Sequence, residues 1–242
     1  MRENLKVNIL WLLLLLAGYG LISVLVSVGV LNLFYVQILQ QIGINIILAV
    51  GLNLIVGFSG QFSLGHAGFM AIGAYAAAII GSKSPTYGAF FGAMLVGALL
   101  SGAVALLVGI PTLRLKGDYL AVATLGVSEI IRIFIINGGS LTNGAAGILG
   151  IPNFTTWQMV YFFVVITTIA TLNFLRSPIG RSTLSVREDE IAAESVGLIR
   201  LKLKSSPLSL VLLLQVLQGH FRQDLSVQLY RKITLSSTQS TY

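Results

Sequence analysis

The sequence predicts an all-α protein that crosses a membrane several times. Of its 242 residues, 55% are hydrophobic and only 10% are charged, whereas a soluble domain usually carries about 25% charged residues. Several uncharged runs reach the roughly 20 residues that a helix needs to span a bilayer. These runs do not alternate apolar and polar residues as the strands of a membrane barrel do. We therefore expect a polytopic bundle of about six transmembrane helices with a cytoplasmic N-terminus.

The first half of the predicted bundle contains three spans and one glycine-rich break. Residues 9–30 carry no charge and form the first span, since a signal peptide has a shorter apolar region. The second span covers residues 38–57, and the third ends near residue 81. Between them, residues 57–68 hold four glycines together with Ser, Gln and His. This composition disfavours a helix, and non-helical backbone occurs at membrane depth only where protein buries it or where it lines a water-filled cavity.

The second half contains three further spans, at residues 88–110, 119–136 and 155–175. A basic loop (111–118) and an uncharged, glycine-rich loop (137–154) connect them. Small residues recur every four positions along the fourth span, namely Ala89, Ala93, Gly97, Ser101, Ala105 and Gly109. Such a stripe lets helix backbones approach closely in lipid. We expect it to pack inside the bundle, with dimerisation as the alternative.

Positive charge gathers on one side of these spans. With the N-terminus inside, the cytoplasm receives Arg2, Lys6, Arg114, Lys116 and the loop 176–204, and among the loops only Lys83 falls outside. This is the positive-inside pattern of membrane proteins. Topology thus explains the net charge of +7 without a nucleic-acid partner. The chain divides into a membrane domain (1–175), a cytoplasmic loop (176–204) and a tail (205–242).

Few side chains within the spans could carry chemistry. Glu129 and Arg132 are three residues apart and share a helix face, and charges inside a membrane are expensive and often functional. The alternative is a structural ion pair that locks helix packing. His66, in the glycine-rich break, fits a packing residue better than a ligand. We find no nucleophile–base pair, metal cluster or phosphate loop, and no cysteine, so we expect no enzyme, metal or cofactor.

The loop 176–204 is the one long charged run, with six of the fifteen Lys/Arg and four of the eight Asp/Glu. Pro178 and Gly180 are expected to end the sixth span. Ser185 and Glu188 have the spacing of a capping box, which predicts a new helix that ends at Gly197. Acidic residues near its start suit the helix dipole. The small apolar face of this helix fits a groove in a soluble subunit, and a solvated surface helix is the alternative.

Four segments of the sequence resemble ABC importer permeases. One segment is similar to the Glu-Ala-Ala–x3–Gly loop of these permeases: Ala192 and Ala193 are followed, after three residues, by Gly197. It departs from the pattern at the first position, where Ile191 stands and the acidic residue, Glu190, lies one position earlier. Three segments are similar to branched-chain amino-acid permeases: 51–75, 115–126 with Glu129-Ile-Ile-Arg132, and 187–194. The last two favour the LivM-type subunit over its LivH-type partner. The resemblance covers residues 1–197, and urea permeases share the pattern.

The resemblance implies a transport subunit of the plasma membrane that moves Leu, Ile or Val and hydrolyses nothing itself. Its implied partners are a second, LivH-type permease, two ATP-binding subunits, an extracytoplasmic substrate-binding protein and the surrounding lipid. The implied ATPase-coupling residues are Glu188, Asp189, Glu190, Ala192, Ala193, Glu194 and Gly197. The break would lie near the translocation path, with Gly60, Gln61, Ser63, Gly65 and His66. The alternatives are a urea or other amide permease and a membrane scaffold.

The tail does not continue this pattern. Residues 205–219 contain an apolar run too short to span, and residues 221–242 have the polar composition of a disordered segment. The codons of residues 214–221 can also be read in the frame that starts two bases later. In that frame they can encode the series alanine, a small residue, a hydrophobic residue, alanine, glycine, a small residue and a hydrophobic residue. Such a series is typical of a close-packed membrane helix. Chance codon choice is the alternative. We expect a frameshift just after Gly197, and thus a truncated permease whose transport activity is in question.

Overall fold

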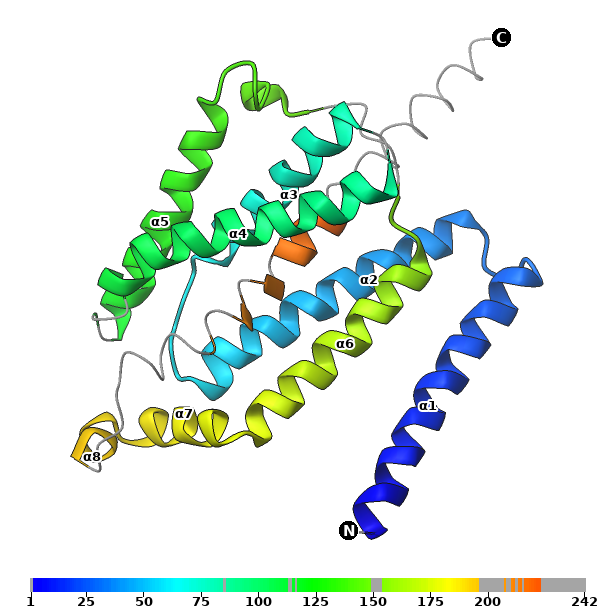
Figure 1. The fold of residues 1–242 in the computed structure, drawn as a ribbon, viewed down its shortest axis with the longest axis horizontal. Helices are drawn as coiled ribbons and strands as arrows, with labels where there is room; N and C mark the ends of the chain where they lie inside the picture. The colour runs from blue at the N-terminus through cyan, green and yellow to red at the C-terminus, as the bar shows by residue number, and fades with distance from the viewer. Residues whose placement is uncertain are drawn as a thin grey trace.

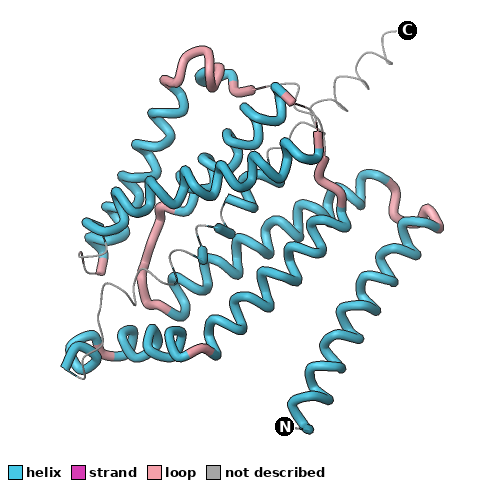
Figure 2. The backbone as a smooth tube through the Cα atoms, viewed as in Figure 1, coloured by secondary structure: helices cyan, strands magenta, loops and turns pink. Residues whose placement is uncertain are grey.

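The computed structural model describes residues 2–84, 86–112, 115, 117–148 and 154–195, and residues 207, 210, 211, 213, 214 and 216–222. All regular structure in this part of the chain is helical (Figures 1 and 2). The long helices are α1 (Arg2–Ser27), α2 (Leu33–Leu52), α3 (His66–Lys83), α4 (Tyr87–Thr112), α5 (Asp118–Ile136) and α6 (Trp157–Arg176). The short elements are η1 (Asn53–Phe58), η2 (Gly144–Ala146), α7 (Pro178–Glu188) and α8 (Glu190–Ser195).

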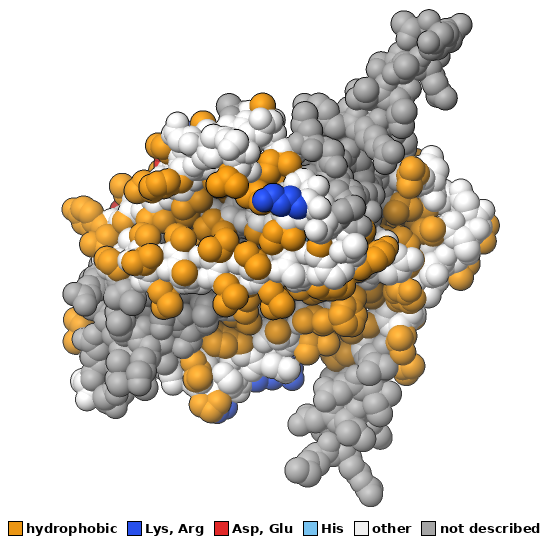
Figure 3. Space-filling model, turned by 45° about the horizontal axis from the view of Figure 1, so that its top comes forward, with side chains coloured by type: hydrophobic (Ala, Val, Ile, Leu, Met, Phe, Trp, Pro, Cys, Tyr) orange, Lys and Arg blue, Asp and Glu red, His pale blue; other side chains and the backbone are white. Residues whose placement is uncertain are grey.

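The predicted all-α membrane fold is confirmed. Four helical stretches among the described residues are long and apolar enough to cross a membrane: Leu33–Phe58, Tyr87–Gly109, Asp118–Ile136 and Trp157–Arg176. Large hydrophobic side chains such as Leu99 and Leu107 on α4 are more than 70% exposed, and hydrophobic side chains are spread over the whole of the visible described surface (Figure 3). That surface suits lipid rather than water. The other two predicted spans correspond to α1 and α3.

The bundle consists of two packed groups, α3–α4–α5 and α2–α6, with α1 at the side of α6 (Figure 1). Within the first group, α4 turns its stripe of small residues toward α3. Ala93 and Ser101 are buried, and a Cβ built on Gly97 would lie 3.2 Å from the Cβ of Ala76. The stripe therefore serves packing inside the chain, as the sequence predicts.

The second group packs equally closely. A Cβ built on Gly43 of α2 would overlap the Cγ1 atom of Val160 on α6. One turn away, the Gln40 side-chain amide (Nε2) donates a hydrogen bond of 3.0 Å to the backbone carbonyl of Thr155. This bond ties α2 to the residues just before α6. These two contacts lie where α2 and α6 run side by side (Figure 2).

The described residues between 207 and 222 are helical and lie in the centre of the bundle (Figure 1), although we expected the whole tail, residues 205–242, to be disordered. Gln218 and Phe221 are fully buried. A Cβ on Gly73 of α3 would lie 2.5 Å from the Val216 carbonyl oxygen, and a Cβ on Gly97 of α4 would lie 3.1 Å from Val216 Cγ1. These glycines leave a slot for a helix backbone, which explains why an apolar segment enters it despite its polar surroundings in the sequence.

Candidate functional site

The glycine-rich break begins with an unusual turn of helix. Helix α2 continues into the π-helix η1, which ends at Phe58. The Ser59 backbone N–H and hydroxyl both donate to the Leu54 carbonyl, at 3.1 and 3.0 Å. Gly60 then has φ +63°, a backbone conformation in which other residues are strained. Non-helical backbone runs from here to Gly65, and π-turns within helices are frequent at functional sites.

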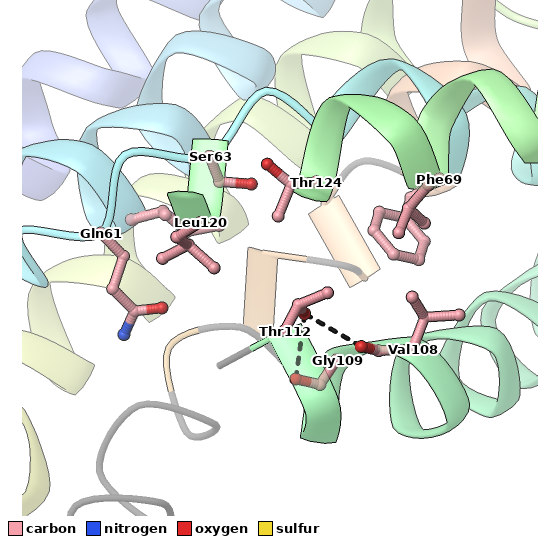
Figure 4. A pocket seen from close by; sticks show the side chains of 10 residues that line it. Gln61, Ser63, Phe69, Val108, Gly109, Thr112, Leu120 and Thr124 are labelled. Carbon is pink, nitrogen blue, oxygen red and sulfur yellow. Dashed lines mark hydrogen bonds between the residues drawn. The ribbon is translucent and has the colours of Figure 1, made fainter. Parts of the chain in front are cut away.

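The break forms one wall of a small pocket, and residues of η1, α3, α4 and α5 form the others (Figure 4). Gln61 and Ser63 come from the break, Thr112 from the end of α4 and Thr124 from α5. The rest of the lining is mostly apolar and includes Ile55, Phe69, Val108, Leu120 and Val127. The pocket therefore combines apolar walls with a few polar side chains, as small-molecule sites do.

Hydrogen bonds orient the two threonines of the pocket. The Thr112 hydroxyl donates to the carbonyls of Val108 and Gly109, at 2.9 and 3.1 Å (Figure 4). The Thr124 hydroxyl donates to the Ala121 carbonyl at 3.0 Å and accepts from the Leu64 backbone N–H, also at 3.0 Å. Thr124 thereby fastens the end of the break to α5. Neither threonine was singled out from the sequence, although Thr124 lies inside the motif at residues 115–126.

The five predicted path residues lie in four different places. Gln61 and Ser63 line the pocket. Gly65 is pressed against α5, since a Cβ there would lie 3.0 Å from the Thr124 carbonyl oxygen. His66 begins α3, and its buried Nδ1 atom has no hydrogen-bond partner among the described residues. Gly60 lies outside the pocket, against the Arg187 side chain.

The helix that follows α6 starts at a different residue from the one predicted. Ser177 caps α7 by accepting a hydrogen bond of 3.1 Å from the Gly180 backbone N–H, and Pro178 follows at the first helical position. Proline is favoured there because its missing N–H is not needed. The predicted capping box is wrong: Ser185 lies within α7, and its hydroxyl donates to the Arg181 carbonyl at 3.1 Å. The sixth span does end just before Pro178, as predicted, since α6 stops at Arg176, and Pro178 and Gly180 lie in the first turn of the next helix.

A second helix, α8, turns off from α7 at Asp189. The Asp189 carboxylate (Oδ1) accepts hydrogen bonds from the backbone N–H groups of Ile191 and Ala192, at 2.9 and 3.0 Å. Aspartate is among the best N-cap residues. The acidic run 188–190, expected to act through the helix dipole, thus supplies a specific cap. The described residues place α7 and α8 at the same end of the bundle as the break (Figure 1).

The surface of α8 presents apolar groups outward. Ile191 is 77% exposed and Ala192 is exposed, whereas Ala193 is only 4% exposed. Ala193 therefore packs within the chain, and its replacement by a large residue would disturb α8 itself. Glu188 is exposed beside Arg187. The Glu190 and Glu194 side chains and Gly197 lie outside the described part of the structure.

Glu129 and Arg132 form an ion pair on α5, with 2.5 Å between the Glu129 Oε1 and Arg132 Nη1 atoms. Both side chains are more than half exposed, so they lie on the face of α5 that this bundle leaves uncovered. Exposed charges within a membrane span call for a polar neighbour.

Together, the apolar helical bundle and the interrupted span define a multi-pass membrane protein. Residues 34–210 match the family model described as branched-chain amino acid transport system / permease component, and the chain belongs to that family. The match extends beyond Gly197, so the predicted limit of the resemblance is too early. Residues 205–210 still follow the family pattern.

Two curated relatives are each described as a high-affinity branched-chain amino acid transport system permease protein LivM, one from Salmonella typhimurium and one from Escherichia coli. Each is 34% identical to this chain over an alignment that covers 48% of this chain and 35% of the relative. The match therefore spans about a third of the length of these relatives. No solved structure matches.

Proposed function

We propose that this chain is a LivM-type permease subunit of an ABC importer in the cell membrane, and that its substrates are the branched-chain amino acids. The observation that carries this proposal is the family match over residues 34–210, which includes both the break and α8. The four spanning helices fit such a subunit. The chain supplies binding surfaces and a path, and its partners supply ATP hydrolysis.

In this proposal α8 docks an ATP-binding subunit. The exposed Ile191 and Ala192 side chains fit an apolar groove, and the nearby Glu188 fits basic residues at its rim. A second, LivH-type permease pairs with this chain, a second ATP-binding subunit binds that permease, and an extracytoplasmic binding protein delivers the substrate. ATP-driven closure of the ATP-binding subunits moves α7 and α8 and so changes the packing of the spans.

The pocket beside the break is the proposed inner part of the translocation path. Its apolar walls suit an aliphatic side chain. Gln61, Ser63 and Thr124 can donate and accept hydrogen bonds with the ammonium and carboxylate groups of an amino acid. An outward rearrangement of the break would widen this space during transport.

The test is uptake of radiolabelled leucine, isoleucine and valine into proteoliposomes that contain this chain with its four partners. We expect uptake that requires ATP and the binding protein. Unlabelled leucine should compete with the labelled substrate, and urea should not. Competition by urea alone would favour the amide permease, and a complex that never forms would favour a scaffold role.

We also propose that a frameshift produced the end of the tail; because the family match runs to residue 210, the shift lies after that residue and not just after Gly197. Both side-chain polar atoms of Gln218 and both ring nitrogens of His220 are buried without hydrogen-bond partners among the described residues, and each such group is costly. The slot between α3 and α4 suits the small-residue helix of the alternative frame better than these side chains. The test is the nucleotide sequence for residues 190–242 in all three frames: an alternative frame with uninterrupted apolar spans is expected, and its absence would overturn the proposal. The uptake experiment should include the restored reading frame as a second sample.

A further inference from the structure

Arg187 joins the cytoplasmic segment to the break in the membrane domain. It lies in the last turn of α7, and its Nη1 atom donates a hydrogen bond of 2.5 Å to the Gly57 backbone carbonyl in η1. The two residues are 130 positions apart in the chain. Because η1 ends at Phe58, carbonyls of its last turn need partners from outside the helix. Arg187 supplies one of them.

The stem of Arg187 makes a second contact, at Gly60. A Cβ built on Gly60 would lie 2.8 Å from Arg187 Cγ and 3.4 Å from Arg187 Cβ. Gly60 has no side chain, and its φ of +63° turns the backbone here, so the aliphatic stem lies directly against the peptide. The guanidinium and the stem thus hold the break on both sides of Phe58.

The far end of the break is held by α5. Gln61 and Ser63 of the pocket follow Gly60 directly, and the next residue, Leu64, donates its N–H to the Thr124 hydroxyl. The pocket wall is therefore suspended between one anchor on α7 and one on α5. A shift of α7 relative to α5 that keeps both anchors would move Gln61 and Ser63, because the segment between the anchors is only a few residues long.

We infer that Arg187 is a positioning residue that transmits movement of α7 and α8 to the break, and through the break to the pocket. This inference rests on the proposed function, in which α8 receives the movement of an ATP-binding subunit. Arg187 itself does not need to contact the substrate or the ATP-binding subunit. A guanidinium suits this role because its donors point in fixed directions from a planar group.

The test follows two distances in the assembled transporter. The chain contains no cysteine, so spin labels can be placed at Ser185 on α7, at Phe62 in the break and at Val122 on α5. All three residues are exposed. Pulsed electron resonance measures the 185–122 and 62–122 distances without nucleotide and with trapped ATP. Both distances are expected to shift together in the otherwise unmodified chain.

In Arg187→Ala, the 185–122 distance should still shift with ATP, whereas the 62–122 distance should lose most of its shift. Arg187→Lys keeps a donor and should retain part of it. Arg181→Ala, which removes a neighbouring arginine of α7, is the matched control and should leave both shifts intact. Substrate uptake per ATP hydrolysed should fall by about tenfold in Arg187→Ala, within the range of site-to-site couplings.

The outcomes separate the two claims. A break that follows α7 equally well in Arg187→Ala overturns the inference and leaves the proposed function standing. An α7 that does not move with ATP in the unmodified chain overturns the proposed coupling role, and the inference falls with it. If Arg187→Ala does not assemble, the 62–122 shift of Arg187→Lys is compared with that of the unmodified chain instead. Lysine keeps the positive charge and one donor group, so a weaker shift would report the loss of the guanidinium geometry.

Discussion

The hydroxyl of Tyr161 on α6 donates a hydrogen bond of 2.7 Å to the backbone carbonyl of Leu15 on α1. Gly18, one turn further along α1, makes room for it, since a Cβ there would lie 3.2 Å from the Tyr161 hydroxyl oxygen. The Tyr19 ring lies 5.2 Å from the Trp157 ring, centroid to centroid. Most of the described side chains of α1 are exposed, so these contacts fix how α1 docks on the bundle.

Tyr161→Phe should loosen α1 without unfolding the rest of the bundle. The substitution removes the hydroxyl and keeps the ring, so we expect a loss of about 0.6 kcal/mol, the average for hydrogen bonds between membrane helices. Faster proteolysis in the 28–32 turn would report it. Tyr119→Phe makes the same change at an exposed tyrosine and should have no effect; equal proteolysis of both variants would show that the bond does not hold α1.

Gly43→Ala should separate α2 from α6. The added methyl group would overlap the Val160 side chain, and overpacking of this kind typically costs about 1–3 kcal/mol. Thermal unfolding in detergent measures it. Gly102→Ala on α4 is the matched control, because a Cβ at Gly102 meets no atom within 4 Å. A Gly43→Ala variant that melts no lower than Gly102→Ala would contradict the packing described for α2 and α6.

Replacing Gln218 by Met should stabilise the chain. Methionine has a similar shape and carries no amide, so two buried polar atoms without described partners disappear; each unsatisfied group costs about 1–3 kcal/mol. The melting temperature should therefore rise. Arg222→Met is the control at an exposed position of the same segment. A lower melting temperature for Gln218→Met alone would mean that the amide has a partner, and would weaken the frameshift proposal.

Glu129→Leu should impair membrane insertion more than the double change Glu129→Leu/Arg132→Leu. The single change leaves the Arg132 charge unpaired within a span, which costs about 2.5–3.5 kcal/mol on insertion scales. The double change removes both charges. Cell-surface yield of the two variants measures the difference. Restored yield together with normal uptake would mark the pair as structural, whereas restored yield without uptake would mark it as part of the transport path.

The sequence is sufficient to predict the six long helices, four of which are long and apolar enough to cross a membrane, because long uncharged runs act over many residues. It is also sufficient for the break, since four glycines within twelve residues disfavour a lipid-facing helix. The start of α7 was mispredicted because Ser185 and Glu188 match a capping box locally, while Ser177 and Pro178 form the stronger start signal just upstream.

Other features depend on contacts that no local pattern records. The hydrogen bond from Arg187 to Gly57 joins residues 130 positions apart. The burial of Ala193 and the exposure of Ile191 depend on the change of direction between α7 and α8 at Asp189. Neither the length of the apolar run at 205–219 nor the polarity of the residues after it predicts that residues between 207 and 222 form a buried helix. Their placement follows from the slot that Gly73 and Gly97 leave in the bundle.

The most direct test of the central claim is co-purification of the ATP-binding subunits with this chain from membranes. The chain should retain them, and Ile191→Arg should lose them, because the apolar Ile191 side chain is 77% exposed on α8. Ile179→Arg, at an exposed isoleucine of α7, should retain them. Undiminished co-purification with a normally inserted Ile191→Arg variant would contradict docking through α8.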